Sequence, residues 1–210
     1  DNDLSKCDDD ADDLADGLPN TWTYWSHSNS NAFENHFKST IIGTGNNNNH
    51  ADNADLAYFS GHGSSSVVDN VYTGTALGTM NFADAAHDDG YLVPSDMDDS
   101  WGNGDMEWLI TTSCRTLRGE GRPYWKWGME GVHLVCGSES SIADQSYGDV
   151  IGEEVVDNGW FDSAITMKEA WFDAMEEWNG GHDVAIVMGE NSTMGSDLVW
   201  DEGPVANDPT

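Results

Sequence analysis

Four short apolar runs, each followed by glycine or a polar residue, constrain the fold of this chain more than any other sequence feature. They occupy residues 55–60, 107–113, 132–136 and 184–188. Runs of this length with such boundaries are typical of buried strands. Helical patterns lie between the later runs, over residues 147–156 and 166–178. Strands that alternate with helices predict an α/β fold with a mostly parallel central sheet and helices on both faces.

The first third of the chain is harder to assign. Apolar residues at spacings of three and four predict an amphipathic helix over residues 4–18, ended by Gly17 and Pro19. The aromatic stretch 21–26 is compatible with a strand. Phe33 and Phe37, four residues apart, favour a helix over 32–38, and the asparagine-rich stretch 43–49 predicts a loop.

The chain shows no internal repeat and no long linker, so we expect one domain over residues 1–210. Within it, residues 1–54 supply the N-terminal helix, strand and helix, residues 55–189 form the core, and residues 190–210 form a C-terminal extension.

Charge excludes several classes of partner. The chain has 39 Asp and Glu against 7 Lys and Arg, a formal net charge of −32. Nucleic acids and anionic membranes are bound through clusters of Lys and Arg, so we expect neither as a partner. No apolar run approaches the ~18 residues of a membrane span. The first residues show no signal-peptide pattern, so we expect an intracellular protein or one whose leader lies outside this sequence.

High net charge also favours disorder, but 38% of the residues are hydrophobic and ten are Trp, enough for a sizeable core. A folded chain with this acid excess is typical of halophilic proteins such as those of haloarchaea. In near-molar salt the Debye length falls to about 3 Å, which screens the repulsion between carboxylates. We therefore expect a protein adapted to high salt, cytoplasmic or secreted.

The ends of two predicted strands carry the candidate catalytic residues. The first run ends at Gly61-His62-Gly63, and the second ends at Cys114. Ligands of parallel α/β sheets bind beyond the carboxyl ends of the strands. A cysteine becomes a strong nucleophile when a neighbouring base or positive charge favours its thiolate, and His62 is placed to act as that base.

These two motifs resemble those of the caspase-like and gingipain-like cysteine peptidases, a group that includes legumains, metacaspases and CHAT-domain proteins. Ser60-Gly61-His62-Gly63 follows one hydrophobic strand, and Thr112-Ser113-Cys114-Arg115 follows the next. The strand at 131–135 and the helix at 163–178 resemble the elements that come after the cysteine motif in this group. The resemblance covers roughly residues 55–188.

The resemblance implies a three-layer caspase-like fold and cysteine-dependent endopeptidase activity on a peptide or protein substrate. Cys114 would be the nucleophile, His62 would protonate the leaving amine, and the amides of Gly63 and Cys114 would form the oxyanion hole. Two positions depart from the family: Thr116 replaces the glycine of caspases, and Thr112 replaces an aspartate of metacaspases. Substrate specificity is therefore left open.

Other candidate residues are given lesser roles. Arg115 either tunes the thiolate and binds an acidic substrate group or pairs with an acid, and we expect Arg118 and Arg122 to pair with acids. Cys136 is expected to pack in the core, and a Cys7–Cys136 disulfide is conceivable but unsupported. Because no pair of histidines shows the short spacing of a zinc site, no metal ligand is assigned and no role is given to the other six: His27, His36, His50, His87, His133 and His182.

No cofactor is expected, although calcium is conceivable at the acid-rich loop 96–105, which lacks EF-hand spacing. Two functions other than peptidase activity are also compatible with the sequence. One is a non-catalytic caspase-like fold that binds a protein partner, and the other is a secreted carbohydrate-binding protein. The oligomeric state does not follow from the sequence.

Overall fold

The computed structural model describes residues 4–19, 22–64, 78–82, 89–98, 100–156, 165–179 and 184–198. Its central sheet has four strands in the order β1-β5-β6-β7. They are β1 (Leu56–Ser60), β5 (Trp108–Thr112), β6 (Leu134–Ser138) and β7 (Ala185–Gly189). The first three are parallel, and β7 runs antiparallel to β6. The prediction of an α/β fold with a mostly parallel sheet is confirmed.

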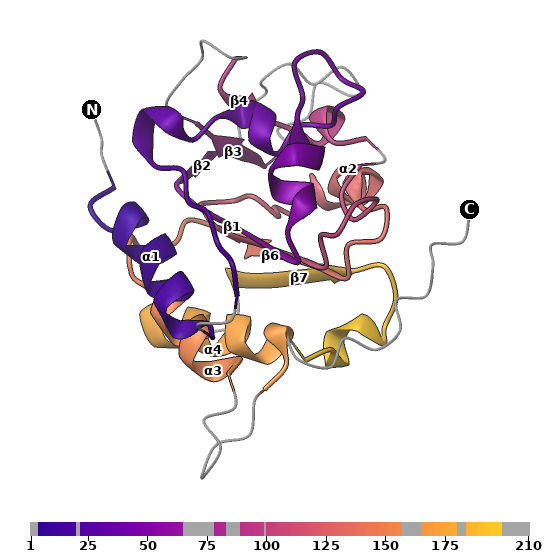
Figure 1. The fold of residues 1–210 in the computed structure, drawn as a ribbon. Coiled ribbons are helices and arrows are strands. Elements are labelled where there is room, and N and C mark those ends of the chain that lie inside the picture. The colour runs from indigo at the N-terminus through magenta and orange to yellow at the C-terminus, as the bar shows by residue number, and fades with distance from the viewer. Residues whose placement is uncertain are drawn as a thin grey trace.

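A second, three-stranded antiparallel sheet follows β1. It contains β2 (His62–Ser64), β3 (Thr79–Asn81) and β4 (Tyr91–Leu92) in that order. These strands are not predictable from the sequence, because they are two or three residues long and contain no apolar run. Figure 1 shows them above the central sheet.

One face of the central sheet is covered by helices α1 (Cys7–Gly17), α3 (Tyr147–Glu154) and α4 (Met167–Asn179) (Figure 1). Trp108 and Ile110 of β5 pack there with Leu14 of α1 and Trp171 of α4. Exclusion of these apolar side chains from water is the main force that holds the helices to the sheet. The predicted helices 4–18, 147–156 and 166–178 are confirmed with small shifts at their ends.

The opposite face differs from our expectation of helices on both faces. Leu109 of β5 and Phe59 of β1 pack there against Leu92 of β4 and Trp125. The only described α-helix in this layer is the single turn α2 (Arg122–Trp125). The described chain also contains short 3-10 turns: η1 (Asn29–Asn31), η2 (Glu34–His36), η3 (Asn47–Asn49), η4 (Ala51–Asn53), η5 (Pro94–Asp96), η6 (Lys126–Gly128) and η8 (Met194–Ser196). The last of these, η8, packs through Met194 in the core beneath the long helices rather than in this layer.

Two predictions in the N-terminal part are wrong. Residues 22–28 form no strand, and Thr21 lies outside the described residues. The predicted helix 32–38 is reduced to the turn η2, because the Lys38 carbonyl accepts from the Asn47 N–H and the Ser39 N–H donates to Asp96. Phe37 packs against Phe59 in the core. Tertiary contacts therefore override the helical spacing.

The strand predicted at 132–136 is shifted by two residues. Gly137 and Ser138 pair with β7, which extends β6 beyond the apolar run. His133, just before the strand, lies between two carboxylates, with Nε2 2.8 Å from Glu107 and Nδ1 2.8 Å from Asp197. His133 therefore lies at the amino end of β6, away from the carboxyl ends of the strands that carry His62 and Cys114.

A buried carboxylate ties helix α1 to the sheet. Asp10 is fully buried and accepts hydrogen bonds from the Tyr58 hydroxyl (2.7 Å), the Thr112 hydroxyl (3.0 Å) and the Gly148 N–H (2.6 Å). These donors belong to β1, β5 and α3. Burial raises the pKa of Asp10, and the hydrogen bonds partly offset that effect.

Replacing Asp10 by alanine is expected to destabilise the protein by about 3 kcal/mol, because three donors lose their acceptor in a dry environment. Urea unfolding in molar KCl measures the change. Asp12→Ala, at an exposed position of the same helix, is the matched control and should stay within about 0.5 kcal/mol of wild type. Equal effects of the two substitutions would show that Asp10 has no special structural role.

The raised pKa of Asp10 also gives this carboxyl a predictable pH dependence. Its proton is held more tightly in the folded state, so its contribution to stability decreases as pH rises from the ordinary value of 3.8 through the raised one.

Candidate active site

The carboxyl ends of β1 and β5 bring the two sequence motifs to one place. The strands are neighbours and parallel, and Ser60 pairs with Thr112 at their last position. His62 and Cys114 each follow two residues later, and both line a pocket of about 40 Å³. Cys7 of α1 and Ile142 line the same pocket. The topology therefore places a thiol and an imidazole at the sheet edge where α/β proteins bind ligands.

The Cys114 thiol is half-buried and contacts one backbone segment. The Ile142 N–H donates to Sγ at 3.4 Å, and Sγ lies 3.7 Å from the Ile142 carbonyl oxygen. Both contacts come from the backbone of one residue, and they fix the position of the sulfur.

The turn that carries Cys114 is pinned to the end of β6. The Ser138 hydroxyl donates to the Ser113 carbonyl at 2.6 Å and accepts from the Arg115 N–H at 2.9 Å. Arg115 has φ +61°, a left-handed conformation that is costly for a residue with a side chain. The turn thus holds a strained conformation directly after the cysteine.

Glycine at position 63 allows the His62 strand to approach the cysteine backbone. A Cβ atom built on Gly63 would lie 2.2 Å from the Cys114 carbonyl oxygen and 2.9 Å from its nitrogen. Neither backbone atom can move without displacing the pinned turn. In the described chain, the Cys114 N–H makes no backbone hydrogen bond.

Gly63→Ala is expected to separate the two motifs, lower the free energy of unfolding by about 2 kcal/mol or more, and strongly reduce any Cys114-dependent reaction. Gly119→Ala is the control, since a Cβ there meets nothing closer than the Glu139 carboxylate at 3.5 Å. Urea unfolding and the labelling rate of Cys114 measure both variants. A Gly63→Ala protein with normal stability and labelling would contradict the close approach.

The arginines follow the cysteine turn. Arg118 pairs with Glu120, and Arg122 with Glu139, which confirms the expectation for both. The Arg115 side chain is exposed, and no ion pair joins it to another described residue.

The other two cysteines are distinct from Cys114. All three are free thiols, so no Cys7–Cys136 disulfide is formed. Cys136 is fully buried in β6, as expected for a packing residue, and burial raises its pKa far above the ordinary value. Burial raises the pKa of Cys7 to about 11, which keeps this thiol protonated at neutral pH. Neither is suited to act as a nucleophile.

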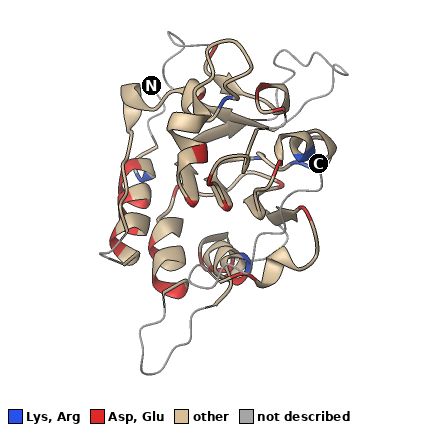
Figure 2. Cartoon of the chain, turned by 45° about the vertical axis from the view of Figure 1, so that its right-hand side comes forward, with Lys and Arg blue, Asp and Glu red and all other residues tan. Residues whose placement is uncertain are grey.

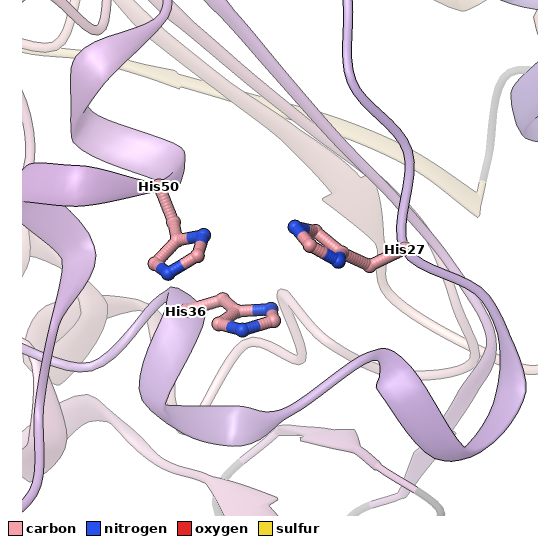
Figure 3. A group of neighbouring side chains, drawn as sticks. All are labelled: His27, His36 and His50. Carbon is pink, nitrogen blue, oxygen red and sulfur yellow. The ribbon is translucent and has the colours of Figure 1, made fainter.

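Three histidines form a cluster that the sequence did not predict. We assigned no role to His27, His36 and His50, but the structure brings their imidazoles together (Figure 3). Their sequence spacings of 9 and 14 residues resemble no metal motif, and they come from segments with little regular structure. The only available signal was their density, since three of seven histidines fall within residues 27–50. His87 and His182 lie outside the described residues.

The acid-rich loop 96–105 does not supply a comparable group among its described residues, which exclude Asp99. Asp96 accepts from the Val93 N–H at 2.9 Å and pairs with the buried Lys38 at 3.0 Å. Its carboxylate thus has partners within the protein.

Among the described residues, no helix is long and apolar enough to cross a membrane. A search of curated proteins found no match, and neither did a search of solved structures. A protein-family comparison matches residues 1–210 to the family described as "Domain of unknown function (DUF6345)". Since this match spans the whole sequence, the chain belongs to the DUF6345 family.

Proposed function

We propose that this protein is a cysteine-dependent peptide-bond hydrolase with a caspase-like fold, in which Cys114 is the nucleophile and His62 the general acid and base. The observation that carries the proposal is the position of both residues just beyond the ends of neighbouring parallel strands, on one shared pocket. The resemblance of the two motifs to caspase-like peptidases supports it.

The reaction would proceed in two steps. The Cys114 sulfur attacks the scissile carbonyl carbon while its proton passes to His62. The Cys114 and Gly63 N–H groups stabilise the oxyanion of the tetrahedral intermediate. His62 then gives its proton to the leaving amine as the C–N bond breaks, which leaves a thioester. A water molecule, deprotonated by His62, hydrolyses the thioester and restores the thiol.

Substrate access is consistent with this assignment. His62 is exposed, whereas Cys114 is half-buried and contacts Ile142. The pocket of about 40 Å³ is too small for a drug-sized ligand. It suits a reacting group held at the surface by an extended peptide, with Asp144 as a carboxylate on the pocket wall.

We also propose that the protein works in near-molar salt. Six of the eleven residues of α1 are Asp, and only Asp10 of these is buried. Asp and Glu are spread over the described helices and loops, while Lys and Arg occur at few places (Figure 2). Such a surface is compatible with a compact fold when salt screens it.

Iodoacetamide labelling in molar KCl, followed by peptide mapping, tests the assignment of the nucleophile. We expect Cys114 to react much faster than Cys7 and Cys136, and His62→Ala to slow Cys114 by about tenfold or more. A non-catalytic member of the same fold, which would use this surface to bind a protein, predicts no effect of His62. Labelling of Cys114 that is no faster than that of Cys7 would contradict the enzyme assignment.

A further inference from the structure

Three histidines from separate segments meet at one point outside the Cys114 pocket. His27 lies on the irregular stretch before η1, His36 ends η2, and His50 stands between η3 and η4. When one ring nitrogen is taken from each histidine, the three nitrogens lie within 4.8 Å of one another. Figure 3 shows the three rings turned toward a common space.

The three rings differ in burial: His36 is buried, His50 is half-buried and His27 is exposed. His36 is 8% exposed, and its ring stacks on His50 with centroids 3.9 Å apart. The Nδ1 atom of His50 is buried and has no hydrogen-bond partner. A buried polar nitrogen without a partner costs free energy, which a bound cation would recover.

The distances fit a small ion after modest side-chain rotation. Zinc binds imidazole nitrogen at about 2.0–2.1 Å, so three tetrahedral donors lie about 3.3 Å apart. The nitrogens in the structure are separated by up to 4.8 Å, and rotation of the rings can bring them to this shorter distance. His27 is exposed, so its side chain is able to adjust. The stacked pair His36–His50, tilted by 24°, must open slightly.

The donor set selects the class of metal. Among the described residues, no carboxylate and no thiol joins the three imidazoles. Imidazole donors favour Zn²⁺ and similar transition metals, whereas Ca²⁺ and Mg²⁺ require oxygen. This distinction matters in a chain with 39 acids, which attract any cation weakly.

We propose that His27, His36 and His50 bind one zinc-class divalent cation and leave its fourth coordination position open. The three residues line a cavity of about 850 Å³, whose wall also contains Trp22, Trp25 and Phe37. Three histidines with an exchangeable fourth position are typical of zinc sites that hold a water or a small ligand. The open position therefore faces a cavity large enough for a small molecule.

The proposal is independent of the role of Cys114, and its test removes that thiol. Metal-free Cys114→Ala protein in molar KCl is titrated with Zn²⁺ by calorimetry. We expect one site, and we expect His27→Ala in this background to weaken binding by at least about 100-fold. His62→Ala in the same background, which also removes one exposed histidine, should bind as its parent does. Ca²⁺ and Mg²⁺ should give no saturable binding at this site.

A spectroscopic measurement identifies the donors. Co²⁺ in place of Zn²⁺ should give the visible bands of a four-coordinate ion without a sulfur charge-transfer band, and His50→Gln should remove them. Circular dichroism confirms that each variant is folded. Absence of Zn²⁺ binding, unchanged binding by His27→Ala, or equal losses in His27→Ala and His62→Ala would each overturn the proposal.

Discussion

Transfer of the protein from about 3 M KCl to dilute buffer is expected to unfold it. With a net charge of −32, the folded chain concentrates carboxylates on a small surface. The Debye length rises from about 3 Å at 1 M salt to about 10 Å at 0.1 M, so repulsion between neighbouring acids returns. Few ion pairs oppose this in the described chain, since the cations there are sparse (Figure 2).

Small-angle scattering and circular dichroism measure the transition. The radius of gyration should rise from about 17 Å toward the value of about 49 Å for an unfolded chain of this length. Replacing Asp12 and Asp16, both exposed on α1, by lysine changes the net charge by four and should shift the midpoint to lower KCl. Replacing KCl by sucrose, which does not screen charge, should not preserve the fold at low salt. A compact, helical protein in millimolar salt would contradict this account.

Replacing Cys114 by alanine is expected to lower the rate of peptide cleavage by at least about 10³-fold, because no other described cysteine can serve as the nucleophile. His62→Ala should lower it by at least about 10²-fold. The double variant should be no slower than Cys114→Ala alone, since the two residues act in one step. A library of fluorogenic peptides in molar KCl supplies the substrate.

Cys136→Ala is the matched control for loss of a thiol. Cys136 is buried in β6, so its replacement creates a small cavity but leaves the pocket intact. Cleavage per folded molecule should remain at the wild-type level. Equal activity of the Cys114→Ala and Cys136→Ala variants would mean that the thiol of Cys114 takes no part in the reaction.

The central strands were predictable because each is a short apolar run with a clear end. Trp108 and Leu109 face opposite cores, so β5 must be apolar on both faces, and the sequence shows this directly. Helices α1, α3 and α4 each bury one face, and the spacing of their apolar residues predicts this as clearly. The antiparallel direction of β7 was not predictable, because it depends on the path of the chain rather than on hydropathy.

The small sheet and the N-terminal segment could not be predicted for a different reason. Strand β2 contains His62, Gly63 and Ser64, which have no strand pattern and are ordered by pairing with β3. The turn η2 depends on contacts of Lys38 and Ser39 with distant residues. Local sequence carries no record of such contacts.

The Cys114 pocket and the histidine cluster also differ in how well the sequence predicts them. His62 and Cys114 follow predictable strands, so their common position at one sheet edge could be inferred from topology. His27, His36 and His50 lie on irregular segments whose approach is set by packing around the large cavity. Only the folded structure brings these three imidazoles together.

The assignment of Cys114 as a peptide-directed nucleophile is tested most directly by comparing two electrophiles with the same reactive group in molar KCl. One carries a peptide, chosen from the cleaved library members, and the other carries none. The account predicts that the peptide reagent modifies Cys114 alone, at least about tenfold faster than the simple reagent, and that His62→Ala removes this advantage. Equal rates for the two reagents, or peptide-dependent modification of Cys7 instead of Cys114, would contradict it.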